Sequence, residues 1–470
     1  MPTKTKAQAA VPTALVADPE PKPKRQRKPK SGSVPTAISL PETETIKSEP
    51  DPEPSPIESK SAPEPAPALS VKVGQEALTI ALTSLEKVVP TKPPHPILGS
   101  ILIEAALGEA RQLTLTATNL MRSVTATLTL PDGVRMEAGA ITVPAKTLKE
   151  VVIHAAGGTL TLNQIAKESG TTLTVLDQDQ GATTLSSNHA SDFPQLSRAY
   201  PQHTLPAKVV LLALRTAAVA SATKEEKGVL YGVHWQLDPE AETLNCTATD
   251  SHRVAQVEAA IGGVGRKRRG TGTDTQIDCR LRADFVRDLC QVLTALEPES
   301  TIDFGYDPDS YQVVFEIQVG GGVQLLMSSQ CHEQPFLDVC GVIGRFIYDK
   351  EVVVDRAALQ ARLERLEATT APSETPVIDI DCRTGSVILS RESQSVQSQQ
   401  VTAATVAEAA QGFKIACNLL YLSSFVKSCQ SQKIKLTMGD PTTLFRVEAA
   451  GETANITTVY YLMPMQRREN

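Results

Sequence analysis

The sequence predicts an α+β fold built from one repeated unit, a short strand followed by an amphipathic helix and further strands. Three observations support this prediction. Six short apolar runs each lead through a polar or Pro-Ala corner into a segment with apolar residues at helical spacing. These helical segments begin roughly 60 to 75 residues apart. Alternating strands such as 113–118 and 159–163 lie between them.

The six units follow one another along the chain in the same order. Their first strands are expected at 71–73, 141–145, 203–207, 277–281, 352–355 and 413–416, and their helices at 75–89, 146–155, 208–221, 282–296, 356–368 and 417–429. Two units make one layered domain, so we predict domains at 69–201, 202–347 and 348–470. Such units placed end to end build an arc.

The first 68 residues have a different composition. They hold 15 of the 32 prolines, ten Lys or Arg and nine Asp or Glu, with few large apolar side chains. Such a segment cannot bury enough surface to offset its ordering entropy, so we predict that 1–68 is a disordered extension. Its basic block, 22–30, could contact DNA non-specifically. We favour a solvated tether whose basic and acidic blocks attract each other.

Composition excludes several classes of protein. The net charge of −7 excludes a uniformly basic nucleic-acid binder, and one Trp with 4% aromatic residues argues against base-stacking platforms. No run approaches the roughly 18 apolar residues of a membrane span, and no apolar run follows the N-terminus as in a secretory signal. The eight Cys form no Cys-x-x-Cys pair, and the seven His form no His-Glu-x-x-His. We therefore expect a cytoplasmic protein with reduced thiols, no metal site and no cofactor.

Every predicted helix carries a cation although the chain is acidic. If the helices share one face of an arc, that face would be basic and could hold a polyanion through its phosphates. Exposed helix faces commonly carry Lys and Arg, and the helices at 282–296 and 356–368 also carry acids, so both explanations stay open. The cations are Lys87, Lys146, Lys149, Lys208, Arg215, Arg282, Arg287, Arg356, Arg362, Arg365 and Lys427.

Five short motifs occur in a fixed order, at 96–99 (Pro-Ile-Leu-Gly), 142–146, 192–194, 248–255 and 463–465 (Met-Pro-Met). On these motifs, the chain from about 70 to 470 resembles the bacterial DNA polymerase III beta subunit, the sliding clamp. The resemblance implies three clamp domains forming a half ring, a head-to-tail ring of two identical subunits, and double-stranded DNA threaded through it without sequence readout. It also implies a non-catalytic processivity factor. The implied partners are the polymerase III catalytic subunit, the clamp loader and other replication and repair proteins.

The resemblance further implies a peptide-binding pocket between the second and third domains. Arg253 would lie at its rim and orient the peptide, while the Met side chains would adapt to apolar anchors. The pocket residues carried over are Leu230, Thr249, His252, Arg253, Val254, Val342, Tyr461, Met463, Pro464 and Met465. The DNA-binding residues are the loop cations Lys92 and Lys224 together with Lys146, Lys149 and Arg282.

The chain departs from the family pattern at a few positions. Leu337 stands where a pocket proline is usual, and Gln466 begins an unusual ending. Thr183 and Thr369 stand at subunit-contact positions that are often large and apolar, which reduces the apolar area available for ring closure.

We predict a sliding clamp that raises the effective concentration of the polymerase at the primer end. The alternative is a divergent clamp-like scaffold that binds replication or repair proteins without closing a stable ring. The adjacent Asp250, Ser251 and His252 do not suggest a hydrolase, because consecutive strand residues point to opposite faces.

Overall fold

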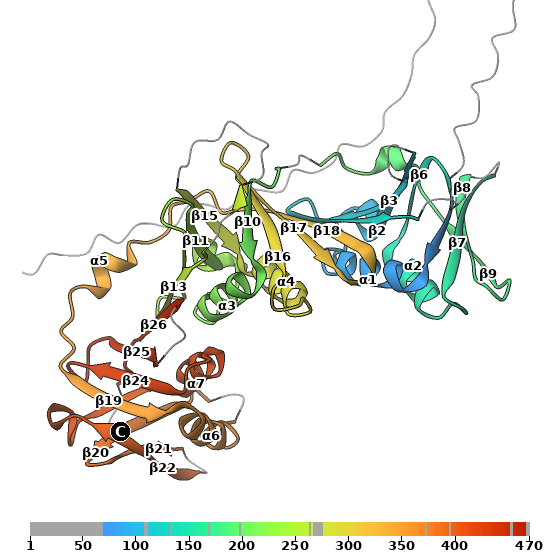
Figure 1. Ribbon diagram of the computed structural model, residues 1–470. Coiled ribbons are helices and arrows are strands. Elements are labelled where there is room, and N and C mark those ends of the chain that lie inside the picture. The colour runs from blue at the N-terminus through green and yellow to red at the C-terminus, as the bar shows by residue number, and fades with distance from the viewer. Residues whose placement is uncertain are drawn as a thin grey trace, which may run out of the picture. The chain divides into compact units, whose positions relative to one another are not determined.

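A computed structural model describes residues 69–466, except 108–110, 132–133, 135, 168–169, 197–198, 263–264, 267–275, 372–373, 394–395 and 452–454. The described residues lie within one compact unit, Glu64–Asn470 (Figure 1). The predicted disordered extension, 1–68, lies outside the described residues, and the boundaries of the three domains stay a prediction.

One order of elements occurs three times: a strand, a helix and three strands, followed by a second strand, helix and three strands. The first and second repeats each contain one additional two-residue strand, β5 or β14. The first repeat contains β1 (Ser70–Gly74), α1 (Gln75–Glu86), β2 (Ser100–Leu107), β3 (Arg111–Thr118), β4 (Arg122–Thr129), β5 (Met136–Glu137), β6 (Gly139–Pro144), α2 (Ala145–Ile153), β7 (Thr159–Lys167), β8 (Gly170–Leu176) and β9 (Ala182–Ser186). The second contains β10 (His203–Pro206), α3 (Ala207–Ala218), β11 (Gly232–Asp238), β12 (Thr243–Thr249), β13 (Arg253–Ala260), β14 (Gly265–Arg266), β15 (Ile277–Arg282), α4 (Ala283–Leu293), β16 (Thr301–Asp307), β17 (Gln312–Val319) and β18 (Val323–Gln330). The third contains β19 (Lys350–Asp355), α6 (Arg356–Glu367), β20 (Val377–Arg383), β21 (Ser386–Glu392), β22 (Gln397–Val406), β23 (Lys414–Asn418), α7 (Leu419–Ser428), β24 (Lys433–Met438), β25 (Phe445–Ala450) and β26 (Ile456–Leu462).

The strands form three sheets, and two of these sheets are shared between repeats. Their orders are β5-β1-β7-β8-β9, β14-β10-β16-β17-β18-β4-β3-β2-β6, and β15-β11-β12-β13-β26-β25-β24-β19-β22-β21-β20-β23. The second sheet joins repeats one and two where β4 pairs antiparallel with β18. The third joins repeats two and three where β13 pairs antiparallel with β26. The neighbouring repeats are therefore connected by continuous backbone ladders.

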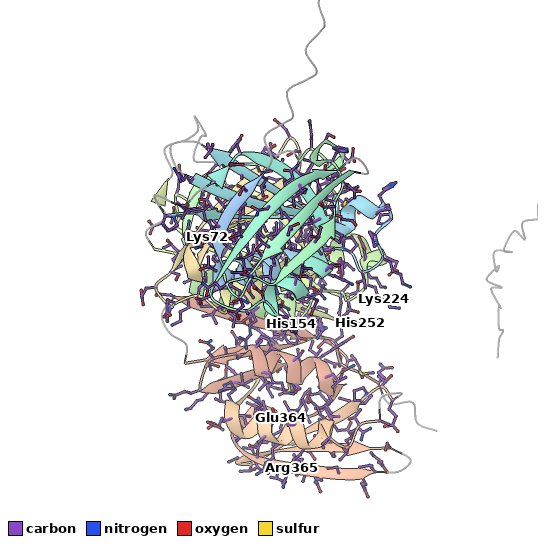
Figure 2. The ribbon with its side chains drawn as sticks, turned by 90° about the vertical axis from the view of Figure 1, so that its right-hand side faces the viewer. Lys72, His154, Lys224, His252, Glu364 and Arg365 are labelled. Carbon is purple, nitrogen blue, oxygen red and sulfur yellow. The ribbon has the colours of Figure 1, made fainter. Side chains whose placement is uncertain are left out.

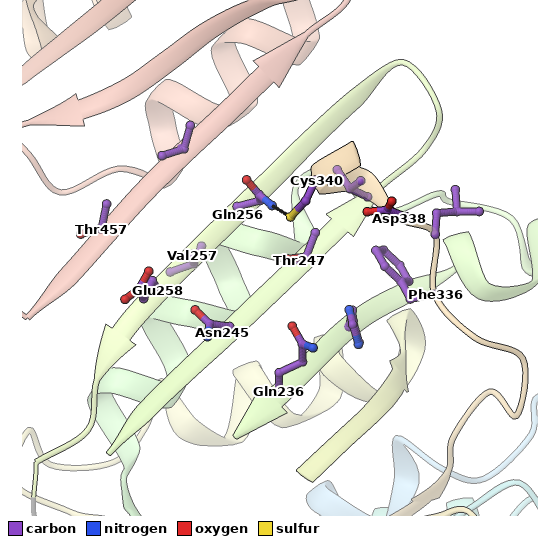
Figure 3. Close-up of a pocket in the computed structure, with 14 residues that line it drawn as sticks. Gln236, Asn245, Thr247, Gln256, Val257, Glu258, Phe336, Asp338, Cys340 and Thr457 are labelled. Atoms are coloured by element: carbon purple, nitrogen blue, oxygen red, sulfur yellow. Dashed lines mark hydrogen bonds between the residues drawn. The ribbon is translucent and has the colours of Figure 1, made fainter. Parts of the chain in front are cut away.

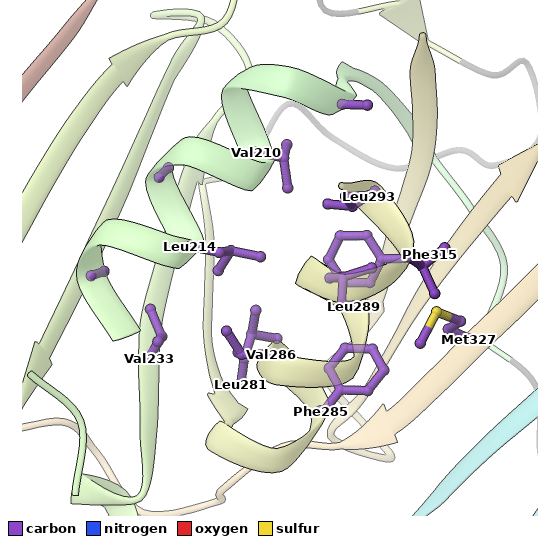
Figure 4. Close-up of a cluster of buried hydrophobic side chains, with 14 of the residues drawn as sticks. Val210, Leu214, Val233, Leu281, Phe285, Val286, Leu289, Leu293, Phe315 and Met327 are labelled. Carbon is purple, nitrogen blue, oxygen red and sulfur yellow. The ribbon is translucent and has the colours of Figure 1, made fainter. Parts of the chain in front are cut away.

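Each repeat buries its two helices against each other and against its strands. In the second repeat, Leu214 of α3 and Leu289 of α4 are fully buried (Figure 4). Trp235 packs edge-on against Phe315 with ring centroids 5.8 Å apart. The six predicted helices are confirmed, as is the predicted α+β class. Local sequence sets where the helices begin: the Asp355 carboxylate accepts the Ala358 N–H (2.8 Å), and the Asn418 side chain accepts the Leu420 N–H (2.9 Å).

Several short elements were not predicted. One is α5 (Val339–Ile343), a single turn in the connection between the second and third repeats. The others are the 3₁₀ turns η1 (Pro96–Gly99), η2 (Ala190–Asp192), η3 (Glu225–Leu230), η4 (Gly320–Gly322) and η5 (Glu408–Ala410). Across the described ranges, none of the helices combines the length and apolar character needed to cross a bilayer.

Candidate functional site

The turn between β12 and β13 carries several of the predicted pocket residues, and its own side chains hold its shape. The Thr249 hydroxyl donates to the Arg253 carbonyl (2.7 Å) and accepts the Ser251 N–H (3.2 Å). One Asp250 carboxylate oxygen accepts the N–H groups of His252 (3.0 Å) and Arg253 (3.2 Å). These bonds hold Ser251 in the left-handed region at φ 80°. His252 is thereby presented to solvent at the tip of the turn.

The Arg253 side chain lies inside the junction between the second and third repeats, and its place at the rim of a peptide pocket stays a prediction. Only 10% of the side chain is exposed. Its Nε donates to Asp250 (2.9 Å), its Nη1 donates to the Ser424 hydroxyl of α7 (3.2 Å), and the guanidinium lies 4.0 Å from the centroid of the Tyr421 ring. A carboxylate and an aromatic face hold the cation better than solvent would. Arg253 therefore anchors the two repeats to each other.

The C-terminal segment lies against this turn. Tyr461 is the ladder partner of Val254 across the β13–β26 pair. Beyond the strand, the Met463 N–H donates to the His252 carbonyl (3.0 Å), and the Met465 N–H donates to the Ala416 carbonyl (2.8 Å). The Met463 side chain is 45% exposed. The structure thus brings together predicted pocket residues from two distant parts of the chain.

The connection between the second and third repeats covers this ladder. On α5, Val339 and Ile343 pack against Leu444 and Tyr461, forming a small apolar cluster beside the main core. The predicted pocket residue Val342 lies on the exposed side of the same turn, at 55% exposure. Burial raises the pKa of Tyr461 above its ordinary value, so its hydroxyl stays uncharged at neutral pH. The surface formed by α5 and the β13–β26 ladder is therefore suited to apolar contact.

Leu230 is the predicted pocket residue with the least direct connection to this surface. It ends η3, and its carbonyl accepts the Ala222 N–H (2.8 Å). Its neighbours Ala222 and Tyr231 line a hollow of about 570 Å³ that Arg253 also lines. The structure therefore places the Leu230 segment near the buried face of the turn.

The turn between β3 and β4, where the first and second repeats meet, has the same backbone geometry as the β12–β13 turn. The two junctions can therefore be compared within one chain. There, Thr118 donates to the Arg122 carbonyl (2.9 Å), and Asn119 accepts the N–H groups of Met121 (3.1 Å) and Arg122 (2.8 Å). The Met121 carbonyl accepts the Gln330 N–H (2.8 Å), as the His252 carbonyl accepts that of Met463. The two turns are structural duplicates.

The side chains at the two junctions nevertheless differ. Ser123 and Ser328, hydrogen-bonded at 2.6 Å, stand where Val254 and Tyr461 form the apolar pair. Arg122 is held by two carboxylates of α4, Asp284 (Nε to Oδ2, 3.2 Å) and Asp288. Of these two described junctions, the second–third junction alone offers the apolar pair beneath α5, which favours it as the partner site.

Of the five predicted DNA-binding cations, three are free and two are engaged. Lys92, Lys146 and Lys224 are exposed, and none of them forms an ion pair within the described ranges. Figure 2 labels Lys224. Lys149 bonds Glu86, with 18% of its side chain exposed.

Arg282 is buried beside α4, and its contact with DNA stays a prediction. It bonds Glu225, its Nε lies 3.5 Å from Asp284, and it lies over the Tyr231 ring at 5.9 Å. Glu225, which follows Lys224 in the sequence, is one of the two carboxylates beside Arg282.

Comparison with known proteins identifies the fold and the family resemblance. Residues 69–197 match the family model of the DNA polymerase III beta subunit, N-terminal domain. The beta sliding clamp of Synechococcus elongatus is 26% identical over 400 residues, covering 84% of this chain and 98% of that protein. The solved sliding clamp of Bacillus subtilis superposes with a TM-score of 0.74 at 18% identity, over 85% of this chain and 100% of that one. A Pseudomonas aeruginosa clamp bound to griselimycin gives 0.72 at 19% identity, with the same coverage.

The chain is similar to DNA polymerase III beta subunits, the sliding clamps, over most of its length.

Three residues that depart from the family pattern lie in the connection before α5, on β9 and after α6. Leu337, in place of a pocket proline, precedes α5 and is 53% exposed. Thr183 lies exposed on β9, whereas Thr369 follows α6 and its carbonyl accepts from Arg391 (2.7 Å). In the described part of the protein, no group of three or more His, Cys, Asp or Glu side chains is arranged to hold a metal ion.

Sequence reasoning missed one further hollow in this protein. A groove of about 440 Å³ lies over β11, β12, β13 and β26, under the segment that leads into α5 (Figure 3). The alternation of side chains along each strand points its polar residues into this groove. The sequence signal was this outward polar set, which includes Asn245, Thr247 and Gln256, but strand order was needed to bring it together.

Proposed function

We propose that this beta subunit-like protein is a sliding clamp, a non-catalytic processivity factor that encircles double-stranded DNA and tethers the replicative polymerase. The observation that carries the proposal is the triple repeat joined by continuous ladders, with an apolar partner surface at one of the two junctions. Encirclement gives sliding retention without base readout, and tethering raises the local concentration of the polymerase. We expect it to act in the cytoplasm.

Ring closure is supported by two strand edges. β4 of the first repeat pairs with β18 of the second, and β13 of the second repeat pairs with β26 of the third. In both ladders, the third strand after the first helix of one repeat meets the last strand of the next repeat. The matching strands that are left are β22 of the third repeat and β9 of the first. β9 lies at the end of its sheet, and β19 pairs only with Ala404–Val406 of β22. We propose that β22 of one subunit pairs with β9 of a second, head to tail, and that two subunits complete the ring.

The open edges also show which backbone groups would pair. The Ser187 N–H donates to Thr171 of β8 (3.2 Å), so by alternation the N–H groups of Ala182, Thr184 and Ser186 face the open side of β9. All residues of β9 and of 397–403 in β22 are uncharged. A main-chain ladder with Thr, Ser and Gln side chains would therefore close the ring.

DNA would be held through phosphates by free cations. Lys92, Lys146 and Lys224 are the exposed candidates, and contacts to phosphates position a protein on DNA without reading its sequence. Glu364 and Arg365 lie next to each other on α6 (Figure 2), so this helix carries both signs of charge, which suits sliding better than tight binding.

Partner peptides would bind where β13, β26 and α5 meet. Val254 and Tyr461 form the floor, Met463 and Val342 are exposed beside it, and His252 lies at the tip of the turn. The adaptable Met side chain suits several apolar anchors. The polymerase III catalytic subunit, the clamp loader and other replication and repair proteins are the partners we propose for this surface.

Sedimentation velocity of Thr184→Pro tests the ring. Proline removes the N–H that faces the open edge, while the inward N–H groups that pair with β8 stay. Thr184→Ala keeps that N–H and is the matched control. We expect dimers for the parent and the alanine variant, and monomers for the proline variant. Monomers of the parent at tens of micromolar, or dimers of all three, would contradict the proposed closure.

A further inference from the structure

The groove over β11, β12, β13 and β26 is a polar site with unused hydrogen-bonding capacity. Its floor carries amides and hydroxyls, and Phe336–Cys340 forms one wall (Figure 3). In the described part of the chain, the Gln256 side-chain amide bonds only to the Cys340 sulfur (3.7 Å), and the Asn245 and Thr247 side chains have no hydrogen-bond partner there. A volume of about 440 Å³ lies within the range of ligand sites, about 300 to 1,000 Å³.

The charge of the groove is negative. Glu258 and Asp338 lie at opposite ends of the labelled lining, with Gln256 and Thr247 between them (Figure 3). Glu258 is exposed and has no partner among the described residues. Asp338 accepts the Gly341 N–H through one oxygen (2.9 Å), which leaves the other free.

Among the described residues, no Lys or Arg lines the groove, and its one histidine is His234. Burial lowers the pKa of His234 below its ordinary value, and the ring stacks on Phe336 at 4.8 Å. The Asp278 carboxylate beside the groove lies 3.0 Å from His234 Nε2 and 3.3 Å from the Arg280 guanidinium, and the Arg280 cation balances its charge.

The groove is continuous with the proposed partner pocket. Val339 lines the groove and also packs against Tyr461, and Val459 lines the groove beside the same apolar cluster. We propose that the groove binds an extended, cationic flank of a partner peptide whose apolar anchor occupies the pocket. The inference rests on the proposed function. Glu258 and Asp338 pair with Lys or Arg of the flank, and the amides bond its backbone.

Three fluorescein-labelled peptides test the proposal: the family's clamp-binding pentapeptide, the same peptide extended at both ends by Lys-Ser-Lys, and the same peptide extended by Glu-Ser-Glu. Affinities are measured by anisotropy for the parent, for Glu258→Lys and for Glu240→Lys. Glu240 is an exposed residue of the β11–β12 turn outside the groove and serves as the matched control. We expect the lysine extension to tighten binding by about fivefold, and Glu258→Lys to remove that gain while Glu240→Lys keeps it.

Alkylation of Cys340 by a maleimide gives an independent readout, because this exposed thiol lines the groove. At equal occupancy of the pocket, the lysine-extended peptide should slow alkylation more than the unextended one. Equal affinity for the two extensions, a gain that survives Glu258→Lys, or equal alkylation rates would overturn the groove alone. Failure of the unextended peptide to bind the parent would overturn the partner pocket and the groove with it. Protection of Cys340 that rises with protein concentration without peptide would assign the groove to a second copy instead.

Discussion

Removing the Arg253 guanidinium should loosen the junction between the second and third repeats. Arg253→Met keeps most of the apolar stem and deletes three interactions: the bond to Asp250 (2.9 Å), the bond to Ser424 (3.2 Å) and the contact with Tyr421 (4.0 Å). The Asp250 carboxylate, 12% exposed, is left without its cation. Breaking a buried ion pair from one side costs about 3 to 5 kcal/mol. Because Asp250 keeps two backbone N–H donors, we expect about 2 to 4 kcal/mol here.

The matching assay is hydrogen exchange of the segment 456–466, since the Met463 N–H bonds the His252 carbonyl across the junction. A loss of about 2 to 4 kcal/mol corresponds to exchange about 30-fold to 700-fold faster. Arg122→Met is the matched control: it should accelerate exchange around Gln330 at the other junction and leave 456–466 unchanged. Unchanged exchange of 456–466 in Arg253→Met would refute the anchoring role.

Three further results are expected. Lys146→Glu should reduce retention on DNA and lower the slope of log affinity against log salt by about 1, and equal retention by this variant and the parent across salt concentrations would contradict this. Arg282→Glu should instead lower the melting temperature, because it places a carboxylate beside Glu225 and Asp284. A maleimide should label Cys340 first among the eight thiols of the native protein, and mass spectrometry finding another cysteine labelled faster would contradict the exposure seen here. Burial lowers the pKa values of His234 and His332 from 6.5, so the unfolded chain takes up protons first and stability should fall as the pH drops through 6.5 and below. Replacing both histidines with Gln should make the melting temperature depend less on pH between pH 7.5 and 5.5. An unchanged dependence of the melting temperature on pH would contradict this cause.

Much of the fold was predictable because local sequence patterns determine where its helices form. Apolar spacing placed all six long helices, and the Pro-Ala corners marked where α2 and α3 begin. The short α5 was missed because a single turn has no periodicity to detect; its signal was Asp338, whose carboxylate caps the turn.

The sequence predicted that two distant segments lie together, but not the contacts that their charged side chains make. The residues carried over by resemblance from the β12–β13 turn and the C-terminal segment do meet. The burial of Arg253 depends on Tyr421 and Ser424, and that of Arg282 depends on Glu225, and no spacing along the chain reports such pairs. Strand pairing was likewise needed to show which edges stay open.

Retention on DNA of defined topology tests the central claim that the protein encircles its substrate. The full chain is loaded onto a nicked circle with the clamp loader of the same cell and ATP, passed through a sizing column in high salt, and then assayed again after a restriction enzyme linearises the circle. A sliding clamp held by topology stays on the circle and leaves the linear DNA over its ends. Equal retention on both forms, or none on either, would contradict the account.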